Sequence, residues 1–154
     1  MMAVVQRVSS ARVVVGGAVI GEIGRGLCVL ASIVREDTDA DLKWMINKLL
    51  TLRVFPSAAA DKAFDVDVTQ IAATGDGGLL LVSNFTVSAQ MKGRRPGFDR
   101  AMPPLDARPM FARFVTLARE TTTLPIATGA FGADMSIRID NDGPVTVILD
   151  SKSP

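Results

Sequence analysis

The sequence has 154 residues, of which 48% are hydrophobic and 21% are charged, and its formal net charge is +1. This predicts one globular domain, residues 1–154, and the small net charge argues against a protein that coats long nucleic acid. The absence of histidine and tyrosine and the single cysteine exclude a Ser-His-Asp or Cys-His catalytic system, zinc bound through imidazole and an internal disulfide.

The N-terminal third is predicted to be β-structure. Residues 3–8 and 11–15 are β-branched runs, Gly16-Gly17 is a hairpin signal, and GLCVLASIV predicts a strand buried on both faces, in which Cys28 is a structural thiol. A helix is predicted next, because Thr38 and Asp41 form a capping-box pattern and apolar residues then recur at helical spacing. These residues are Leu42, Met45, Ile46, Leu49 and Leu50.

The second half is predicted to alternate again between strands and a helix. RVFP is expected as a short strand, residues 57–78 as a surface excursion, and LLLVSNFTV as a buried strand that leads into the basic loop AQMKGRRPGFDRAMPP. The strands MSIRID and VTVILD are expected on either side of a chain reversal at NDGPVT, which Pro144 stiffens. The second helix carries Met110, Phe111, Phe114, Leu117 and Ala118 on one face.

The fold class expected from these elements is α/β, in a single domain. Because two main helices are too few to cover both faces of so much sheet, we expect helices on one side of two sheet layers or of one curled sheet. No apolar run reaches the about 18 residues of a membrane span, and MMAVVQRVSS lacks the charged start of a signal peptide. We therefore expect a cytoplasmic protein with no membrane partner.

Polar side chains gather where LLLVSNFTV ends, at Ser83, Asn84 and Thr86. Because α/β sheets bind ligands beyond the carboxyl ends of their strands, this end is a candidate site, and the basic loop that follows could steer an anionic substrate to it. Two plainer interpretations stay open, in which these polar groups bind neighbouring backbone and the charged loop is only solvated. The basic loop includes Lys92, Arg94 and Arg95.

Two further segments have more than one interpretation. TGAFGADM could form a pocket wall, or an ordinary turn with Phe131 packed beneath it. Asp61, Asp65 and Asp67 could hold a metal ion, but they lack an EF-hand pattern, so a solvated loop is favoured.

Six segments in order, from residue 2 to about 151, together resemble the D-aminoacyl-tRNA deacylase family. They are AVVQRVSSARVVV, GEIGRGLCVL, LLLVSNFTV, KGRRPGF, GAFGADM and NDGPVTVILDS. The resemblance implies a homodimer with a layered α/β/β architecture and mixed and antiparallel sheets. It implies hydrolysis of the ester that joins a D-amino acid, or glycine mischarged on the alanine tRNA, to the terminal adenosine of tRNA. The resemblance also implies that the 2′-hydroxyl of the terminal ribose assists the attacking water. We expect no cofactor, no metal ion and no DNA partner.

The resemblance also assigns residues. Ser83, Asn84, Phe85 and Thr86 match the family's Ser-Gln-Phe-Thr motif in the aminoacyl pocket, and the N–H groups of Phe85 and Thr86 are expected to stabilise the oxyanion. The pocket wall near the terminal adenosine is matched by Phe131 and Met135.

The resemblance assigns a chiral gate as well. Gly143 and Pro144 match a cis Gly-Pro pair that each subunit inserts into its partner's site to exclude L-substrates, and Arg7 matches the arginine that braces it. Without the resemblance, a trans proline that merely opens a strand would be expected.

Three departures from the family pattern affect the expected substrate preference and rate more than the fold. Asn84 replaces the family's glutamine, Val87 replaces a leucine, and Lys62-Ala63-Phe64 replaces Lys-Met-Asn. A non-catalytic module that binds the tRNA acceptor end on the same fold is therefore the alternative function. A third possibility, less favoured by the order of the motifs, is a small-ligand or interaction module.

Overall fold

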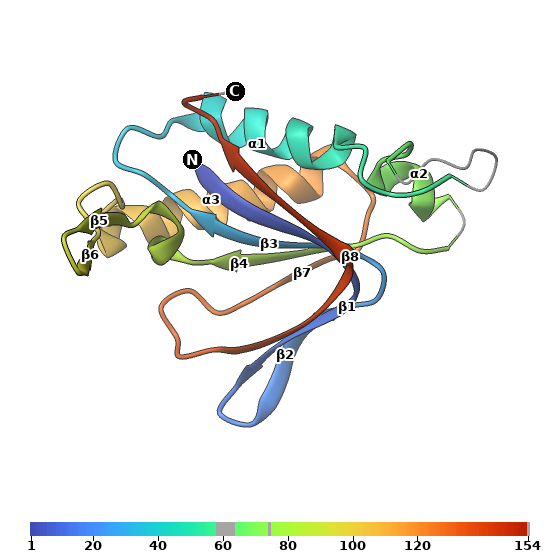
Figure 1. Cartoon of the computed structure of the whole chain (residues 1–154), viewed down its shortest axis with the longest axis horizontal. Helices are drawn as coiled ribbons and strands as arrows, with labels where there is room; N and C mark the ends of the chain where they lie inside the picture. Colours follow the sequence, from blue (N-terminus) through green and yellow to red (C-terminus); the bar gives the residue numbers. More distant parts are fainter. Residues whose placement is uncertain (58–63, 74, 154) are drawn as a thin grey trace.

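The computed structural model describes residues 1–57, 64–73 and 75–153, which form one α/β domain with three helices and a mixed sheet (Figure 1). The main sheet contains β1 (Met2–Val15), β2 (Ala18–Ile23), β3 (Gly26–Ser32), β4 (Leu79–Ser83), β7 (Ile126–Thr128) and β8 (Ser136–Asp150). A separate hairpin is made of β5 (Gln90–Lys92) and β6 (Arg95–Gly97). The helices are α1 (Asp39–Thr51), α2 (Val68–Ala72) and α3 (Pro104–Thr121).

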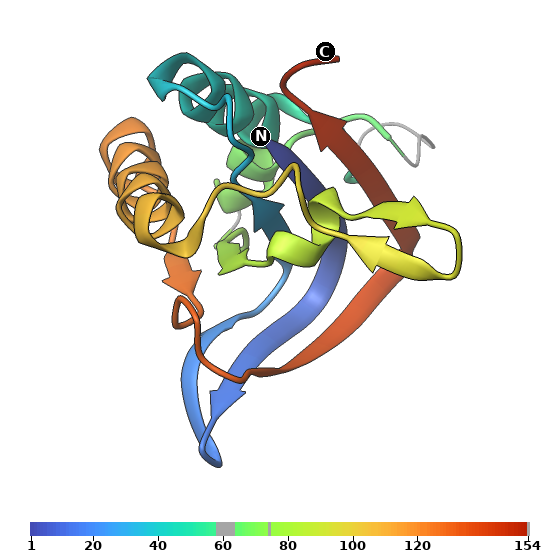
Figure 2. The ribbon, with the colours of Figure 1, turned by 90° about the vertical axis from the view of Figure 1, so that its left-hand side faces the viewer.

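The sheet curls because β1 is long and changes partners along its length. Its first half pairs with β3 and its second half with β2, while β8 runs antiparallel to both halves and shifts register near Val8. Figure 2 shows the bend of these long strands. β3, β4 and β7 are mutually parallel, so the predicted mixed sheet is confirmed. Of the two expected arrangements, the curled sheet is the one observed.

The helices cover one face of this sheet. The apolar face predicted for α1 is buried against it, and burial of such side chains stabilises a fold by roughly 1.5–3 kcal/mol each. On the other face, Cys28, Leu80 and Val82 pack against Val13 and Ile23 from the curled part of the sheet. The chain therefore has a helical layer and two layers of β-structure.

The N-terminus of α1 holds a carboxylate that is anchored from three sides. Thr38 and Asp41 make the predicted capping box, in which Asp41 accepts the Thr38 N–H at 2.9 Å. Lys152 Nζ lies 2.8 Å from Asp41 Oδ1, and Ser151 donates to the same atom at 2.8 Å. Burial alone would raise the pKa of Asp41, but hydrogen bonds from Lys152, Ser151 and Thr38 outweigh it and hold the pKa well below the usual value of 3.8.

Cys28 is fully buried in the second β-layer, and burial raises the pKa of its thiol to about 12. A thiol with so high a pKa stays protonated near neutral pH and is a poor nucleophile. The prediction of a structural thiol is confirmed.

The predicted chain reversal at NDGPVT is wrong. β8 continues through it, with Asp140 opposite Ser10 on one side and Thr146 opposite Gln6 on the other. The segment instead forms a bulge, because the Asn141 side chain accepts the Val145 N–H at 3.0 Å and donates to the Val145 carbonyl at 3.1 Å. This side chain closes a local loop that leaves the strand direction unchanged.

Other boundaries also differ from the prediction. The strands predicted at 3–8 and 11–15 are one strand, and the strand predicted through LLLVSNFTV ends at Ser83. A third helix, α2, lies within the predicted excursion, where Asp67 and Gln70 form a capping box. RVFP contributes only an isolated bridge between Phe55 and Val66. No helix in the described part of the chain is long and apolar enough to cross a membrane.

Candidate active site

A pocket of about 730 Å³ lies beyond the carboxyl ends of the parallel strands β3, β4 and β7. Five of the predicted site residues line it, and they come from the end of β4 and from the loop between β7 and β8: Ser83, Asn84, Phe85, Phe131 and Met135. Residues from the start of α3 close another side, including Pro103, Pro104 and Ala107. A pocket is therefore present at the edge of the sheet where the site was expected.

A 3₁₀ turn, Phe85–Ser88, forms the polar end of the pocket. Asn84 caps it, since its Oδ1 accepts the Thr86 N–H at 3.1 Å and the Thr86 hydroxyl at 2.6 Å. The Thr86 N–H, predicted as an oxyanion donor, is therefore occupied in this structure. Thr86 is exposed and is absent from the pocket lining.

Two buried serines fix this turn against β3. Ser32 donates to Ser88 at 2.8 Å, and Ser88 donates to the Phe85 carbonyl at 3.0 Å. The Asn84 N–H donates to the Ala31 carbonyl at 2.8 Å, which extends the pairing of β3 and β4 by one residue. Among the described residues no acceptor binds the Phe85 N–H. This N–H is therefore a free hydrogen-bond donor, and the bonds of Asn84, Ser32 and Ser88 fix the backbone that carries it.

Aromatic rings and a methionine make the opposite wall. Phe131 packs 6.2 Å from Phe111 of α3, measured between ring centroids, and the Arg108 guanidinium lies 4.9 Å from the Phe131 ring centroid. Gly129 leaves space for Met135, because a Cβ at that position would lie 2.7 Å from the Met135 sulfur. TGAFGADM therefore forms a pocket wall, one of its two predicted roles.

The pocket lining contains one titratable side chain, Arg35, and no carboxylate, lysine or cysteine. An arginine stays protonated in proteins and cannot act as a general base. The Ser83 hydroxyl has no recorded partner within the described part of the chain and is half-buried at the pocket surface.

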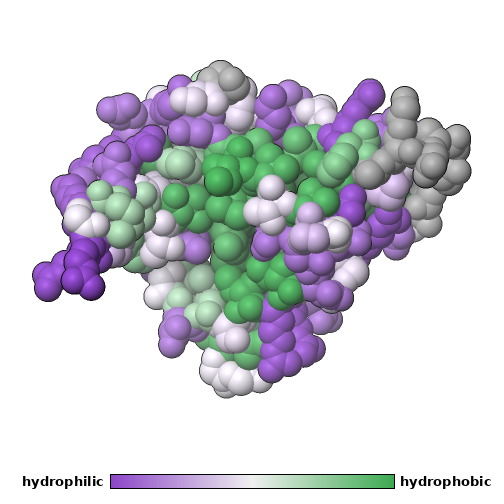
Figure 3. Space-filling model, in the orientation of Figure 1, coloured by the Kyte–Doolittle hydropathy of each residue, from purple (hydrophilic) through white to green (hydrophobic). Residues whose placement is uncertain are grey.

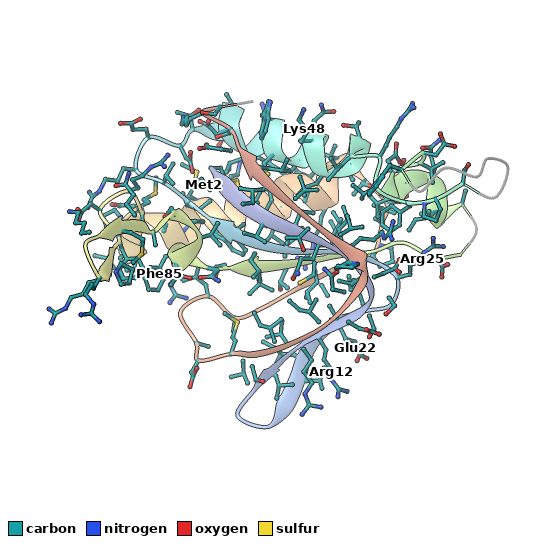
Figure 4. The ribbon with its side chains drawn as sticks, in the orientation of Figure 1. Met2, Arg12, Glu22, Arg25, Lys48 and Phe85 are labelled. Atoms are coloured by element: carbon teal, nitrogen blue, oxygen red, sulfur yellow. The ribbon has the colours of Figure 1, made fainter. Side chains whose placement is uncertain are left out.

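The cationic part of the predicted basic loop forms a β-hairpin beside the pocket, and Lys92, Arg94 and Arg95 are absent from the pocket lining. The rest of the loop, from Phe98 to Pro104, contributes lining residues. Lys92 forms an ion pair with Asp99, whereas Arg94 and Arg95 are exposed and have no recorded ion pair among the described residues. Phe98, which follows the hairpin, packs edge to face on Phe85 with ring centroids 5.0 Å apart. In Figure 4, Phe85 lies at the hairpin end of the molecule, whereas Arg25 lies at the other end of the sheet.

Gly143 and Pro144 lie in the β8 bulge, are exposed, and are joined by a cis peptide bond. They do not line the pocket of their own chain. Arg7 is buried beneath them: its Nε donates to the Asp142 carbonyl at 3.2 Å and lies 3.0 Å from Asp142 Oδ2, and its Nη1 donates to the Val54 carbonyl at 2.6 Å. The predicted contact between Arg7 and this segment is confirmed.

The described residues contain no cluster of three or more His, Cys, Asp or Glu side chains that could hold a metal ion. Asp67 caps α2 by accepting the N–H groups of Thr69 and Gln70, and Asp61 lies outside the described residues. Of the substituted triplet, Lys62 and Ala63 also lie outside them.

Arg35, Phe98 and the residues that begin α3 line the pocket but were not predicted as site residues. Phe98 belongs to the quoted KGRRPGF motif, and Pro103 and Pro104 end the quoted basic loop, whereas nothing in the sequence marked Arg35.

The fold and the pocket define a single-domain α/β protein with a pocket at the carboxyl edge of a mixed sheet. Residues 4–150 match the family model described as D-Tyr-tRNA(Tyr) deacylase. A D-aminoacyl-tRNA deacylase of Geobacter sulfurreducens is 46% identical, covering 99% of this chain and 97% of its own. A D-aminoacyl-tRNA deacylase of Chlorobaculum parvum is 49% identical, and the match covers 98% of this chain and 98% of that protein.

A solved structure named c-Myc DNA Unwinding Element Binding Protein has a TM-score of 0.91 at 42% identity, covering 97% of this chain and 98% of its own. The chain belongs to the D-aminoacyl-tRNA deacylase family.

Proposed function

We propose that this protein hydrolyses the ester of D-aminoacyl-tRNA in the cytoplasm, and also that of glycine mischarged on the alanine tRNA. The observation that carries the proposal is the pocket, which offers apolar walls, a fixed backbone donor and no side-chain base, in a chain of this family. Such a site suits an ester whose hydrolysis is assisted by a hydroxyl of the substrate itself.

In this proposal the protein positions the ester and the 2′-hydroxyl of the terminal ribose assists the attacking water. The Phe85 N–H stabilises the oxyanion, and Asn84 keeps the turn that presents it. The Thr86 hydroxyl bonds to Asn84 and acts through the turn. Thr86→Ala should therefore reduce turnover far less than the about 10²–10⁴-fold typical of a lost general acid or base.

Selection against L-amino acids would come from a second copy of the chain. β8 is an edge strand that pairs only with β1 among the described strands, and exposed edges of this length are normally covered. Ile148 on β8 is 70% exposed and lies in a cross-strand row with Val4 and Leu30. Figure 3 shows hydrophobic surface across the middle of the molecule, on the face that β8 crosses in Figure 1. A homodimer that covers this surface would bring Gly143 and Pro144 to the partner's pocket.

Ile148→Glu tests the dimer. Placing a carboxylate on the apolar surface should give a monomer by light scattering and abolish selection between D- and L-tyrosyl-tRNA. Ile20→Glu is the matched control, because Ile20 is 45% exposed on β2 and lies outside this row. A monomeric wild-type protein that still selects the D-ester would contradict the partner gate.

The hairpin is proposed to hold the tRNA backbone through Arg94 and Arg95, with Lys92 shared between Asp99 and the RNA. Each phosphate contact to a single strand contributes about −0.7 to the slope of log K against log salt. The Arg94→Ala and Arg95→Ala double variant should bind tRNA more weakly and with a flatter salt dependence. Unchanged binding across salt concentrations would make the hairpin a bystander.

The central experiment follows ester loss from D-tyrosyl-, L-tyrosyl- and glycyl-tRNA, with and without a chelator. The expected result is hydrolysis of the D- and glycyl esters alone, unaffected by chelation. Binding without ester loss would support the acceptor-end binding module instead. Activity lost on chelation and restored by a divalent ion would refute a metal-free mechanism.

A further inference from the structure

Arg35 is a cation at the pocket mouth that the proposed mechanism does not use. It follows β3, lines the pocket and is exposed. Its Nε donates to the Asp99 carbonyl at 2.7 Å, and its own N–H donates to the Arg100 carbonyl at 3.0 Å. The first bond holds the side chain and the second holds the backbone, and no bond or ion pair within the described residues uses the two terminal NH₂ groups of Arg35.

Arg35 also stands where the pocket meets the hairpin. The residue that anchors it, Asp99, forms the ion pair with Lys92 of β5. The neighbouring Phe98 lines the pocket and packs on Phe85. A chain that leaves the pocket on this side therefore passes Arg35 and then the cations of the hairpin.

We propose that Arg35 binds the phosphate that joins the terminal adenosine of the tRNA to the preceding nucleotide. The inference rests on the proposed function. A guanidinium whose Nε is already fixed offers its remaining donors to a phosphate in a preorganised fork. The site also sets a direction, since the RNA strand leaves the pocket over the hairpin.

Arg108 also lies near the pocket, and an RNA strand could instead leave the pocket past it, over α3. Its guanidinium lies over the ring of Phe131, and it has no recorded ion pair among the described residues. It lacks a link to the hairpin, so an RNA strand leaving past Arg108 would diverge from Arg94 and Arg95. The two arginines therefore give opposite expectations for one experiment.

The experiment compares hydrolysis of 3′-O-(D-tyrosyl)adenosine with that of the same ester carrying a 5′-phosphate. Wild-type protein should prefer the phosphorylated ester in kcat/KM by on the order of tenfold, as expected for hydrogen bonds to a charged group. Arg35→Ala should abolish the preference through a higher KM for the phosphorylated ester, and a thermal unfolding curve that matches the wild type shows that the variant is folded. Arg35→Lys should keep part of the preference, because lysine supplies the charge without the fork.

Arg119→Ala is the control, since Arg119 is an exposed arginine in the last turn of α3 and is absent from the pocket lining. It should keep the full preference. The inference is overturned if Arg35→Ala keeps the preference, if Arg108→Ala removes it, or if the wild type treats the two esters alike. Failure of the wild type to cleave D-tyrosyl-tRNA would instead count against the proposed function.

Discussion

Replacing Arg7 with alanine removes the side chain that ties the β8 bulge to the rest of the domain. The guanidinium joins the carbonyl of Val54, after α1, to the carbonyl and carboxylate of Asp142, next to Gly143. A Cβ on Gly143 would lie 3.0 Å from Arg7 Nη2, so the arginine packs directly against the exposed pair. The substitution should therefore affect both stability and the position of Gly143 and Pro144.

The magnitude follows from the burial of each contact. The bond to Val54 is buried and charge-assisted, and a bond of this kind contributes about 1.5–3 kcal/mol. The Asp142 carboxylate is 42% exposed, so water largely replaces its partner and the ion pair contributes about 0–1 kcal/mol. Arg7→Ala should lower the free energy of unfolding by about 1.5–4 kcal/mol.

Urea unfolding measures the stability change, and the ratio of D- to L-tyrosyl-tRNA hydrolysis measures the selectivity of the folded variant. Asp142→Asn is the matched control: it keeps the backbone acceptor and removes only the exposed charge, so it should cost at most about 1 kcal/mol. Arg7→Ala should also reduce selectivity, because the exposed pair loses its support. An unfolding free energy within about 0.5 kcal/mol of wild type, or an unchanged D/L ratio, would refute the reasoning.

Gly26→Ala should destabilise the fold by at least about 3 kcal/mol in urea unfolding, because the added Cβ would lie 2.2 Å from the Gly78 carbonyl oxygen. Gly24→Ala is the control: its Cβ would meet no atom within 4 Å, so it should change stability by less than about 0.5 kcal/mol. Asp41 has a lowered pKa when folded, so its contribution to stability is present above pH 3.8 and should be lost as the pH falls below it. The Asp41→Asn variant should lose less stability than the wild type as the pH falls, which an acid titration followed by circular dichroism measures. Cys28 should react with a thiol reagent at pH 8 only after unfolding, and rapid native labelling would contradict its burial.

The parts of the fold that local patterns determine were predicted well. The apolar spacing and capping box of α1, and the apolar face of α3, are properties of one segment and needed no knowledge of the rest of the chain. The five residues of α2 are too few to establish a helical period, so this helix was predicted as part of an excursion.

The errors arose where distant residues decide the structure. The NDGPVT segment has the composition of a reversal, but β1 pairs with both halves of β8 and keeps them in one strand. Likewise, the β-branched and apolar residues of LLLVSNFTV predict a continuous strand, whereas Asn84 caps a 3₁₀ turn that Ser32 and Ser88 fix to β3.

The site could be predicted only in part for the same reason. The end of β4 carries its polar residues in one short run, which the sequence displays directly. Arg35 is one exposed arginine among many in the sequence, and its importance depends on Asp99, 64 positions away, which fixes its side chain at the pocket. No local pattern reports such a contact.

The apolar lining of the pocket fits the proposal that chirality is read by an element outside it. Its volume of about 730 Å³ falls within the roughly 300–1,000 Å³ of ligand sites, and its walls are mostly apolar. Apolar walls discriminate weakly between substrates of equal size, since a misplaced methylene changes binding by only about 1–3 kcal/mol. Strong selection between mirror-image esters therefore needs a rigid obstacle on one side of the α-carbon. Gly143 and Pro144 are exposed, braced by Arg7 and absent from the lining of their own pocket, so the proposed gate requires a second copy of the chain that brings them to this pocket.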